Sequence, residues 1–438
     1  MSFNTIGVSS PLSLAVFRSV LFGYLAWSAV TTYDWAWFAA LPEALRTPPA
    51  FTGWYAALPL TPEVVRVAQW ALVLTAALAA LGCYTRITSI AAAILALLLL
   101  GVPQLYGWKV DHGHHVVWFA AILAASPCSD AFSIDAWRRG GPPPPPSRAY
   151  GVPLRFVWAL MGLIYLFPGL AKAQLLPRWA TAANLQFHLY EKWAELDGFQ
   201  PLLPVDQWPL VLVLAAAGTI LFEVSFVVLI WFRQTRWLAV AGGLLFHTMT
   251  WQMMAISVVS LLLCYVAFVP WERVTAWWQG MAVETEPDRR PSWLSTRIVG
   301  ATLVAGVALA SVFNVNSWPF SIYPTFAYLS RPAIVRAELV PVDAAGAPMA
   351  VAPATWSRIK DRMKTGRWER ILRRLGASNS AARDRVAAAV FTVLAREDAT
   401  LASASALDVY LTTRSVLPSD RDKPPRRRIL AARIALAP

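Results

Sequence analysis

Charged residues are scarce in this chain. Only 14% of its 438 residues are Asp, Glu, Lys or Arg, whereas 57% are hydrophobic. A soluble protein of this length needs more polar surface than that to cover its core. The composition therefore excludes an ordinary soluble globular protein and predicts an all-α polytopic membrane bundle. The 22 tryptophans agree with this, because indole rings favour the boundary between membrane and water.

Cysteine and acidic residues are also few. The three cysteines, Cys83, Cys128 and Cys264, lie in or beside hydrophobic segments and form no CxxC pair. This pattern argues against a disulfide framework and against a zinc site.

Lys and Arg outnumber Asp and Glu by 38 to 25, which gives a net charge of +13. Since no nucleic-acid-binding motif accompanies the charge, we expect no nucleic-acid partner and attribute it to cytoplasmic loops and anionic membrane lipids.

Long apolar runs fill the first three quarters of the chain. A helix needs about 20 residues to cross a membrane, and about eight to nine runs approach that length. The first 13 residues lack the basic region and cleavage site of a signal peptide, so we expect the first run to be retained. Pro168 and Gly169 end the fifth run, where a helix should break or kink. The candidate spans are residues 12–31, 64–83, 88–107, 114–128, 154–171, 209–232, 237–253, 255–270 and 296–313.

The distribution of Lys and Arg predicts the orientation of these spans. Loops that follow even-numbered spans carry ten such residues, and the other loops carry five. By the positive-inside rule, the N-terminus is cytoplasmic and the C-terminal region lies outside. Long translocated regions escape this rule, so the basic C-terminal region does not oppose the assignment. We therefore expect a multi-pass protein of the bacterial plasma (inner) membrane.

The composition changes near residue 314. Residues 333–349 predict a strand, a turn and a second strand, and residues 407–417 predict another strand. Residues 368–375 and 381–398 have the pattern of amphipathic helices. We divide the chain into a transmembrane domain (1–275), a linker with the last span (276–313) and a small extracytoplasmic α+β domain (314–438).

Three ionisable residues lie well inside the predicted spans, away from their ends: Arg18, Glu223 and His247. Charge at membrane depth is costly, so each of them needs a partner or a function. One interpretation is structural, with an Arg–Glu ion pair and a hydrogen bond between consecutive helices. The other is functional, and under it these three residues are our candidates for cofactor binding.

A histidine cluster, KVDHGHH, covers residues 109–115 at the expected outer mouth of the fourth span. Three interpretations are open: a metal site, a histidine that transfers protons at the mouth of a cavity, and an ordinary interfacial cluster. The histidines do not share one helical face, and no second cluster completes a ligand shell. We therefore predict no metal site and retain His114 and His115 as candidate catalytic residues.

A lysine follows the Pro-Gly pair in YLFPGLAKAQLLPRW (165–179). Apolar residues flank Lys172 on both sides, so its amine is expected to be partly desolvated, which favours a neutral amine that acts as a general base. The alternative is a lysine at a helix end whose amine extends to the membrane surface. Sequence physics alone leaves both open.

Five segments in order resemble the membrane portion of vitamin K-dependent γ-carboxylase and its bacterial relatives, the HTTM-domain proteins. They lie within residues 10–275, over which the resemblance extends. PLSLAVFRSVLFGYL carries an F-R pair, LGCYTRITS a short basic turn, and SIDAW an S-x-D pattern. YLFPGLAKAQLLPRW resembles the stretch of the catalytic lysine, and FHTMTWQMMAISVVS the F-H-x-x-x-x-Q helix. The segments are residues 11–25, 81–89, 133–137, 165–179 and 246–260.

This resemblance implies an enzyme that uses a reduced quinone of the vitamin K or menaquinone type, together with oxygen, to generate a strong base. Lys172 falls on the position of the lysine that deprotonates the quinol. His114 is the best match to a helper histidine and His115 nearly as good. His247 matches a later histidine whose role we do not assign.

The chain also departs from the carboxylase. It has Ala171-Lys172 where the carboxylase has paired lysines, and its C-terminal region shows no clear similarity to the propeptide-binding domain. Quinol- and oxygen-dependent chemistry is therefore the leading prediction. Carboxylation of an envelope or secreted protein as the substrate is a weaker prediction than quinol oxidation. The alternative is a non-catalytic membrane scaffold or maturation partner that acts through its external domain. A transporter is disfavoured because no repeats or paired broken helices are present.

Overall fold

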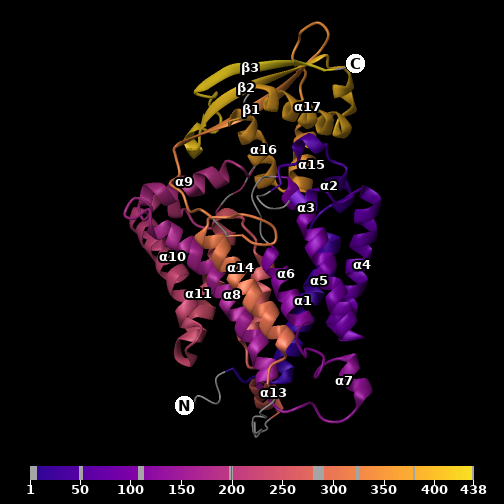
Figure 1. Ribbon diagram of the computed structural model, residues 1–438. Helices are drawn as coiled ribbons and strands as arrows, with labels where there is room; N and C mark the ends of the chain where they lie inside the picture. Colours follow the sequence, from indigo (N-terminus) through magenta and orange to yellow (C-terminus); the bar gives the residue numbers. More distant parts are fainter. Residues whose placement is uncertain are drawn as a thin grey trace.

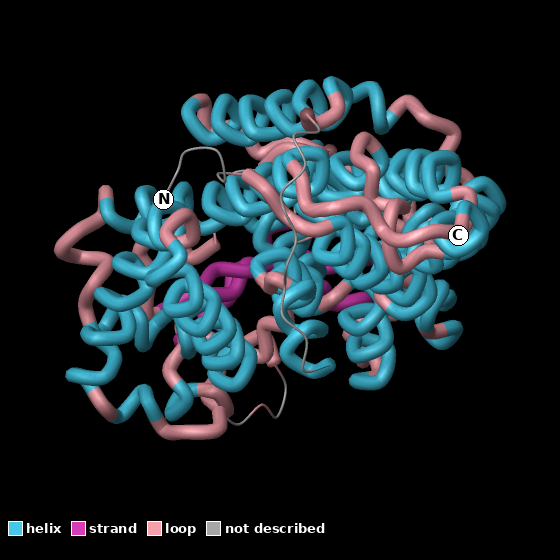
Figure 2. The backbone as a smooth tube through the Cα atoms, turned by 90° about the horizontal axis from the view of Figure 1, so that it is seen from below, coloured by secondary structure: helices cyan, strands magenta, loops and turns pink. Residues whose placement is uncertain are grey.

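The structure, a computed structural model, describes residues 7–48, 53–106, 113–196, 199, 201–279, 291–321, 325–377 and 380–436. A helical bundle carries a smaller part with a three-stranded sheet on one of its ends (Figure 1). Seen from below, the strands lie behind the helices of the bundle (Figure 2). The bundle comprises α1 Pro11–Thr31, α2 Trp35–Ala39, α3 Gly53–Ala56, α4 Pro62–Leu81, α5 Thr85–Gly101, α6 His114–Ala124, α7 Ile134–Arg139, α8 Arg148–Ala173, α9 Ala182–Trp193, α10 Pro209–Leu229, α11 Arg233–Met254, α12 Val259–Cys264, α13 Trp271–Gln279 and α14 Leu294–Val312.

Six of the described helices are long and apolar enough to cross a membrane: α1, α4, α5 (with the turn that follows it), α8, α10 and α14. The pair formed by residues 259–268 and α13 would make a seventh span, but it bends by 69° at its break. The predicted helical membrane protein is thus confirmed, while the predicted eight to nine spans are not. Helix α11 has 22 residues but is not one of these six, because polar residues at its start and within it, among them Arg236, His247 and Gln252, lower its apolar character.

The predicted fourth span is wrong in length. Helix α6 covers only the 11 residues His114–Ala124, about half of what a crossing requires. Its side chains are apolar on nearly every face, and all but two of its residues are buried. A helix that is hydrophobic all round is surrounded by protein. The apolar run therefore reflects burial among other helices and not contact with lipid.

Of the break or kink predicted at Pro168 and Gly169, the break is wrong, because α8 continues through both residues to Ala173. The glycines of α8 have a different use. A Cβ on Gly162 would lie 2.8 Å from a methyl carbon of Val227, and one on Gly169 would lie 2.8 Å from Cβ of Glu223. Small residues thus let α8 and α10 approach closely, as in other membrane helix pairs. This approach brings the polar groups of the two helices together.

Two of the segments that carry the family resemblance meet at the end of the bundle far from the sheet. Asp135, in the SIDAW segment, accepts hydrogen bonds from the backbone N–H groups of Tyr84 (2.9 Å) and Thr85 (2.7 Å). These groups lie at the start of α5, so Asp135 caps that helix from a distant part of the chain. Burial opposes ionisation of Asp135, but a hydrogen bond from the Thr85 hydroxyl (2.6 Å) and the two backbone hydrogen bonds outweigh it and lower the pKa of its carboxyl group.

The C-terminal part is an antiparallel sheet in the order β1-β2-β3, packed on helices α16 and α17. The predicted strands at the start of 333–349 and at 407–417 are confirmed as β1 and β2, and the predicted helices at 368–375 and 381–398 are confirmed as α16 and α17. The second strand predicted within 333–349 is wrong, since Pro348 makes only an isolated bridge with Val342. The elements are β1 Ala333–Val342, α15 Pro353–Met363, α16 Thr365–Ala377, α17 Ser380–Glu397, β2 Ala406–Ser415 and β3 Arg427–Ala435.

Polar contacts fix this C-terminal part on the bundle. Arg373 of α16 binds Glu191 (2.6 Å) and Glu195 (3.1 Å) beside α9. On the other side, the Trp37 indole donates to the Glu397 carboxylate at 3.0 Å. Burial alone would lower the pKa of Arg373, but the two carboxylates outweigh it and hold that pKa above its ordinary value. The sheet-bearing part is therefore held by ion pairs on one side of the bundle end and by a hydrogen bond to a carboxylate on the other.

Candidate functional site

Lys172 and Glu223 form an ion pair inside the bundle. Nζ of Lys172 lies 2.7 Å from both carboxylate oxygens of Glu223, and only 3% and 7% of the two side chains is exposed. Each partner compensates the other, as buried charge in a membrane protein requires. The sequence placed Arg18 as a partner for a buried glutamate, whereas the structure gives Glu223 the lysine. The amine of Lys172 does not reach the solvent.

An aromatic layer separates this pair from a cavity at the sheet-bearing end of the bundle. The Lys172 amine lies 5.6 Å from the centroid of the Trp179 ring, which is 2% exposed. Trp179 donates its indole N–H to the carbonyl of Phe326 at 2.9 Å, and its ring lies 6.3 Å from that of His188. His188 and Phe326 line the cavity, whereas Lys172 and Glu223 do not. The layers run from the ion pair through Trp179 to His188.

His188 is buried and its tautomer is fixed. Its Nε2 lies 3.1 Å from the Tyr328 carbonyl oxygen, and a carbonyl can only accept, so Nε2 carries the proton. Its Nδ1 is then a buried acceptor, and it has no hydrogen-bond partner among the described residues. Burial lowers the pKa of His188 by more than the hydrogen bond to Tyr328 and the charge of Glu191 raise it, and the Lys172 charge adds a smaller lowering. His188 is therefore neutral at pH 7.

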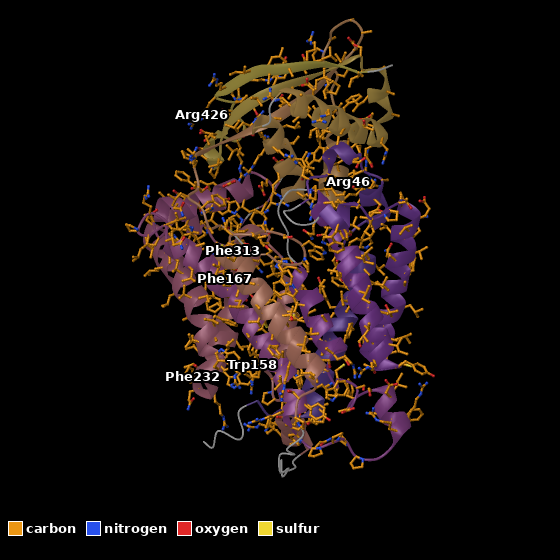
Figure 3. The ribbon with its side chains drawn as sticks, in the orientation of Figure 1. Arg46, Trp158, Phe167, Phe232, Phe313 and Arg426 are labelled. Atoms are coloured by element: carbon orange, nitrogen blue, oxygen red, sulfur yellow. The ribbon has the colours of Figure 1, made fainter. Side chains whose placement is uncertain are left out.

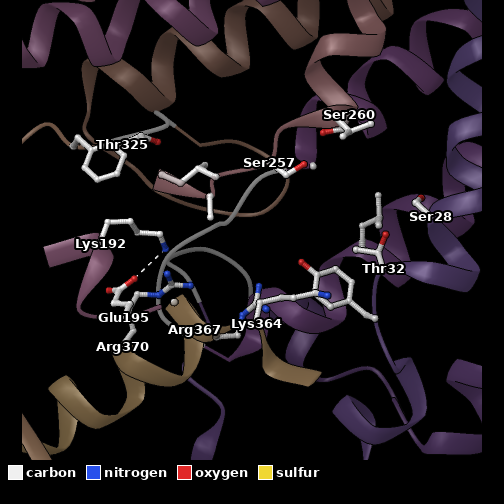
Figure 4. Close-up of a pocket in the computed structure, with 18 of the residues that line it drawn as sticks. Ser28, Thr32, Lys192, Glu195, Ser257, Ser260, Thr325, Lys364, Arg367 and Arg370 are labelled. Atoms are coloured by element: carbon white, nitrogen blue, oxygen red, sulfur yellow. Dashed lines mark hydrogen bonds and ion pairs between the residues drawn. The ribbon is translucent and has the colours of Figure 1, made fainter. Parts of the chain in front are cut away.

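The cavity has a volume of about 1450 Å³ and lies between the bundle and the C-terminal part. Figure 4 shows Arg367 and Arg370 on one side of it and Ser257 and Ser260 opposite them. Helices α1 and α9, the segment around α12 and helix α16 all contribute to its wall. Its aromatic lining residues are Tyr24, Trp27, Tyr33, Phe326 and Tyr328, and its hydroxyl-bearing ones include Ser28, Thr31, Thr32, Ser257, Ser260 and Thr325.

His247 belongs to a separate polar cluster in the bundle. Its Nε2 lies 2.5 Å from the Tyr165 hydroxyl, which lies 2.7 Å from the hydroxyl of Tyr265. Gly243, one turn before His247 on α11, leaves the space that the Tyr265 hydroxyl fills. The cluster joins α8, α11 and the turn after α12 by interhelical hydrogen bonds, and none of the three side chains lines the cavity. Its geometry is that of a helix-joining network.

Arg18 lies at the other end of the bundle. Its guanidinium donates to the backbone carbonyls of Cys128 (2.8 Å), Phe132 (2.5 Å) and Ala80 (3.3 Å), and its side chain is fully buried. These contacts join α1 to the end of α4 and to the chain before α7. In Figure 3, Trp158 and Phe232 mark this far end, and Arg46 marks the end that bears the sheet. The structure therefore does not bring Arg18 together with Glu223 or His247.

His114 and His115 open helix α6 and are both buried. The His114 ring lies 4.8 Å from that of Trp118, and the His115 ring lies 6.0 Å from that of Phe119. Neighbouring Gly113 and Val116 line the cavity, so the histidines lie just behind its wall. His112 and the rest of 107–112 lie outside the described residues. Within the described ranges, no group of three His, Cys, Asp or Glu residues could hold a metal ion.

The sequence analysis missed His188. It lies in FHLYEKW (187–193), outside every predicted span and every segment of the resemblance. One signal was available: α9 has aromatic residues on both sides of a histidine and acidic and basic residues near its end, which is typical of a helix at a membrane surface. That pattern indicates a position at the bundle end but does not indicate a cavity.

Comparison with known proteins identifies a family for the greater part of the chain. The family model described as the HTTM domain matches residues 8–272, which include α8, α9, α10 and α11 and hence the ion pair and His188. No curated protein matches the chain, and no solved structure matches it either. The match agrees with the resemblance read from the five segments. This multi-pass membrane protein belongs to the HTTM-domain family.

Proposed function

We propose that this protein is a membrane enzyme that oxidises a reduced quinone with oxygen at the cavity on its sheet-bearing end. The observation that carries the proposal is the succession of layers from the Lys172–Glu223 pair through Trp179 to His188 and the cavity. It places proton-carrying groups beside a space of about 1450 Å³, which is large enough for a small organic molecule.

The lining residues fit a quinol ring. Such a ring is flat and apolar with two polar oxygens, and the cavity offers aromatic faces from Tyr24, Phe326 and Tyr328 together with hydroxyl groups from Ser28 and Ser257. These residues would hold the ring and orient its oxygens. When bound, a reduced quinone supplies two electrons and two protons to the reaction with oxygen.

The chain's own groups would hold and move the protons. The neutral His188 has an unprotonated Nδ1 in the cavity wall and is the nearest candidate acceptor. Lys172 can accept a proton only after its own has passed to Glu223 across 2.7 Å, which leaves a neutral amine beside a carboxylic acid. Trp179 keeps water away from that exchange, so Lys172 and Glu223 would hold the proton as one unit behind the aromatic layer.

The proposal places the cavity and the C-terminal part on the extracytoplasmic side of the plasma membrane, as the Lys and Arg distribution predicts. The Arg18 end, with α7, then lies in the cytoplasm. Cysteine labelling from each side of sealed vesicles tests this placement. In sealed vesicles whose outer face is the extracytoplasmic one, the cysteine of a Trp137→Cys variant should be labelled only after the vesicles are opened, because Trp137 is exposed at the end assigned to the cytoplasm. Labelling of this cysteine in vesicles that are still sealed would contradict the placement.

The test of activity uses purified full-length protein and a reduced menaquinone analogue with oxygen. Wild-type protein should consume both. The double variant Lys172→Gln/Glu223→Gln keeps a hydrogen bond in the same volume but removes the exchangeable charge, and it should abolish turnover. The Arg178→Gln variant changes an exposed charge six residues away and should turn over normally. Equal turnover by the double variant would refute the role of the pair, and absence of turnover by wild type would favour the non-catalytic alternative.

A further inference from the structure

Two arginines share one tryptophan ring at the end of the bundle far from the sheet, which Trp158 marks in Figure 3. The guanidinium carbon of Arg155 lies 3.7 Å from the centroid of the Trp158 ring, and that of Arg236 lies 4.2 Å from it. Arg155 and Trp158 belong to α8, whereas Arg236 belongs to α11. Two like charges from different helices therefore converge on the same aromatic side chain.

Protein contacts fix the position of the Trp158 ring. Its indole N–H donates to the carbonyl oxygen of Ala267 at 2.9 Å, and its ring stacks on that of Phe268 with 5.0 Å between the centroids. A cation over an aromatic face is stabilised by the quadrupole of the ring. The ring has no net charge, however, so it cannot neutralise two cations. Trp158 therefore positions both guanidinium groups and leaves their charge in place.

No carboxylate binds either arginine in the part of the chain that the structure describes. Within those ranges the Arg155 guanidinium makes no hydrogen bond or ion pair, and the Arg236 guanidinium donates only its Nε–H, to the carbonyl of Ile230 at 2.9 Å. Arg236 lies in the first turn of α11, which Arg233 begins and no side-chain hydrogen bond caps. The positive end of the helix dipole adds to these charges, so the cluster favours an anion.

An exposed apolar stripe on α11 begins beside the arginines. Trp237, Leu244 and Trp251 recur every seven residues, which places them on one side of the helix. They are 47%, 42% and 55% exposed. The stripe is about 21 Å long, which exceeds half the thickness of a bilayer core, about 15 Å. An anion at the arginines therefore lies at one end of a surface that an acyl chain can cover.

We propose that this end of the bundle binds an anionic phospholipid, with its phosphodiester between Arg155 and Arg236 and an acyl chain along the stripe. Guanidinium groups offer paired donors that match phosphate oxygens. Basic sites between membrane helices are typical of acidic lipid head groups. A head group with an ammonium would add a third cation, so the site favours a net negative charge. The inference is independent of the proposed quinol chemistry, because the cavity lies at the opposite end of the bundle.

Binding of short-chain lipids to the full-length protein in an uncharged detergent tests the inference. The probes are dioctanoyl phosphatidylglycerol, dioctanoyl phosphatidylcholine, which has the same chains and phosphodiester but no net charge, and glycerol phosphate, which has no chains. Phosphatidylglycerol should bind most tightly, and its affinity should fall as salt is added. Failure of phosphatidylglycerol to bind, or equal affinity for phosphatidylcholine, would overturn the anion site. Equal affinity for glycerol phosphate would overturn the lipid assignment.

A charge-matched pair of double variants locates the site. Arg155→Gln/Arg236→Gln removes the two cations and should weaken phosphatidylglycerol binding on the order of 30-fold. Arg86→Gln/Arg138→Gln is the control. It removes two exposed arginines whose guanidinium carbons lie 5.3 Å and 5.2 Å from the centroids of two separate aromatic rings, and its affinity should stay within about threefold. Equal weakening in both variants would overturn the site.

A single variant separates binding from folding. Because the Arg155 guanidinium has no hydrogen bond to any described residue, Arg155→Gln leaves no protein group unpaired and should fold as the wild type does. It should still weaken phosphatidylglycerol binding several-fold. Wild-type affinity in this variant would contradict the contact between Arg155 and the phosphodiester.

Discussion

The buried ion pair and the cation-lined cavity deal with charge near a membrane in opposite ways. Lys172 and Glu223 cancel each other across 2.7 Å with almost no exposed surface, so the pair needs nothing from outside the protein. The cavity has six cations and two carboxylates among its described lining residues. The comparison teaches that a closed ion pair is suited to passing a proton between its two members, whereas charged side chains in a cavity wall are placed to contact what the cavity holds.

The largest expected effect comes from breaking the compensation inside the bundle. Lys172→Met leaves Glu223 buried without its cation and should lower the free energy of unfolding by about 3–5 kcal/mol. In Lys172→Met/Glu223→Met no charge is left uncompensated, so this double variant should recover most of the loss. Denaturant titration in detergent measures both. Equal destabilisation of the single and double variants would show that the pair does not compensate buried charge.

A smaller effect should follow from separating the helices that bring the pair together. Gly169→Ala places a Cβ 2.8 Å from Cβ of Glu223 and should destabilise the protein by about 1–3 kcal/mol. Gly218→Ala in α10 meets no atom within 4 Å and should be neutral or stabilising by up to about 1 kcal/mol. Thermal unfolding compares the two variants. A similar loss in both would exclude close α8–α10 packing as the cause.

The sequence predicted the long apolar helices better than it predicted where individual helices begin and end. Apolar length located α1, α4, α5, α8, α10 and α14, because lipid requires long uninterrupted helices. It failed for α6, since a helix buried among other helices is as apolar as one in lipid. It also failed at Pro168, because a proline inside a membrane helix is tolerated where neighbouring helices support the backbone.

The candidate site was predicted in part. Glu223 was identified as a charge at membrane depth and Lys172 as a candidate general base, but their pairing depends on the glycines that let α8 meet α10, which no local pattern reveals. His188 was missed because its importance comes from residues at 326–328, which lie far away in the sequence. The roles predicted for His114, His115, His247 and Arg18 stay predictions, and Arg18 lies at the opposite end of the bundle from the cavity.

The pH dependence of stability should reveal His188 at the boundary between the two regions. Its pKa is lowered in the folded state, so the folded protein binds fewer protons than the unfolded chain as the pH falls below the ordinary value of about 6.5. Stability should therefore be constant above that pH and fall below it, by at most about 1.4 kcal/mol per pH unit. His188→Gln, compared with wild type by thermal unfolding from pH 8 to 5, should lose this component. An unchanged pH profile would contradict a buried neutral imidazole.

The smallest effect concerns the contact that closes the cavity on the α9 side. Arg373→Gln removes the cation shared by Glu191 and Glu195. Because the Arg373 side chain is 30% exposed, water screens the contact and the loss should be about 1 kcal/mol. The difference from wild type should shrink in high salt, as measured by melting temperature. A salt-independent loss would assign the effect to packing of the arginine stem instead.

The central claim is that the layers beside His188 serve a molecule bound in the cavity, and a cryo-electron microscopy map obtained without oxygen and with a reduced menaquinone analogue tests it most directly. The account predicts ring-shaped density in the cavity beside His188 and Phe326, with Lys172 and Glu223 behind Trp179. Density for the analogue elsewhere on the bundle, with the cavity filled only by solvent, would contradict it.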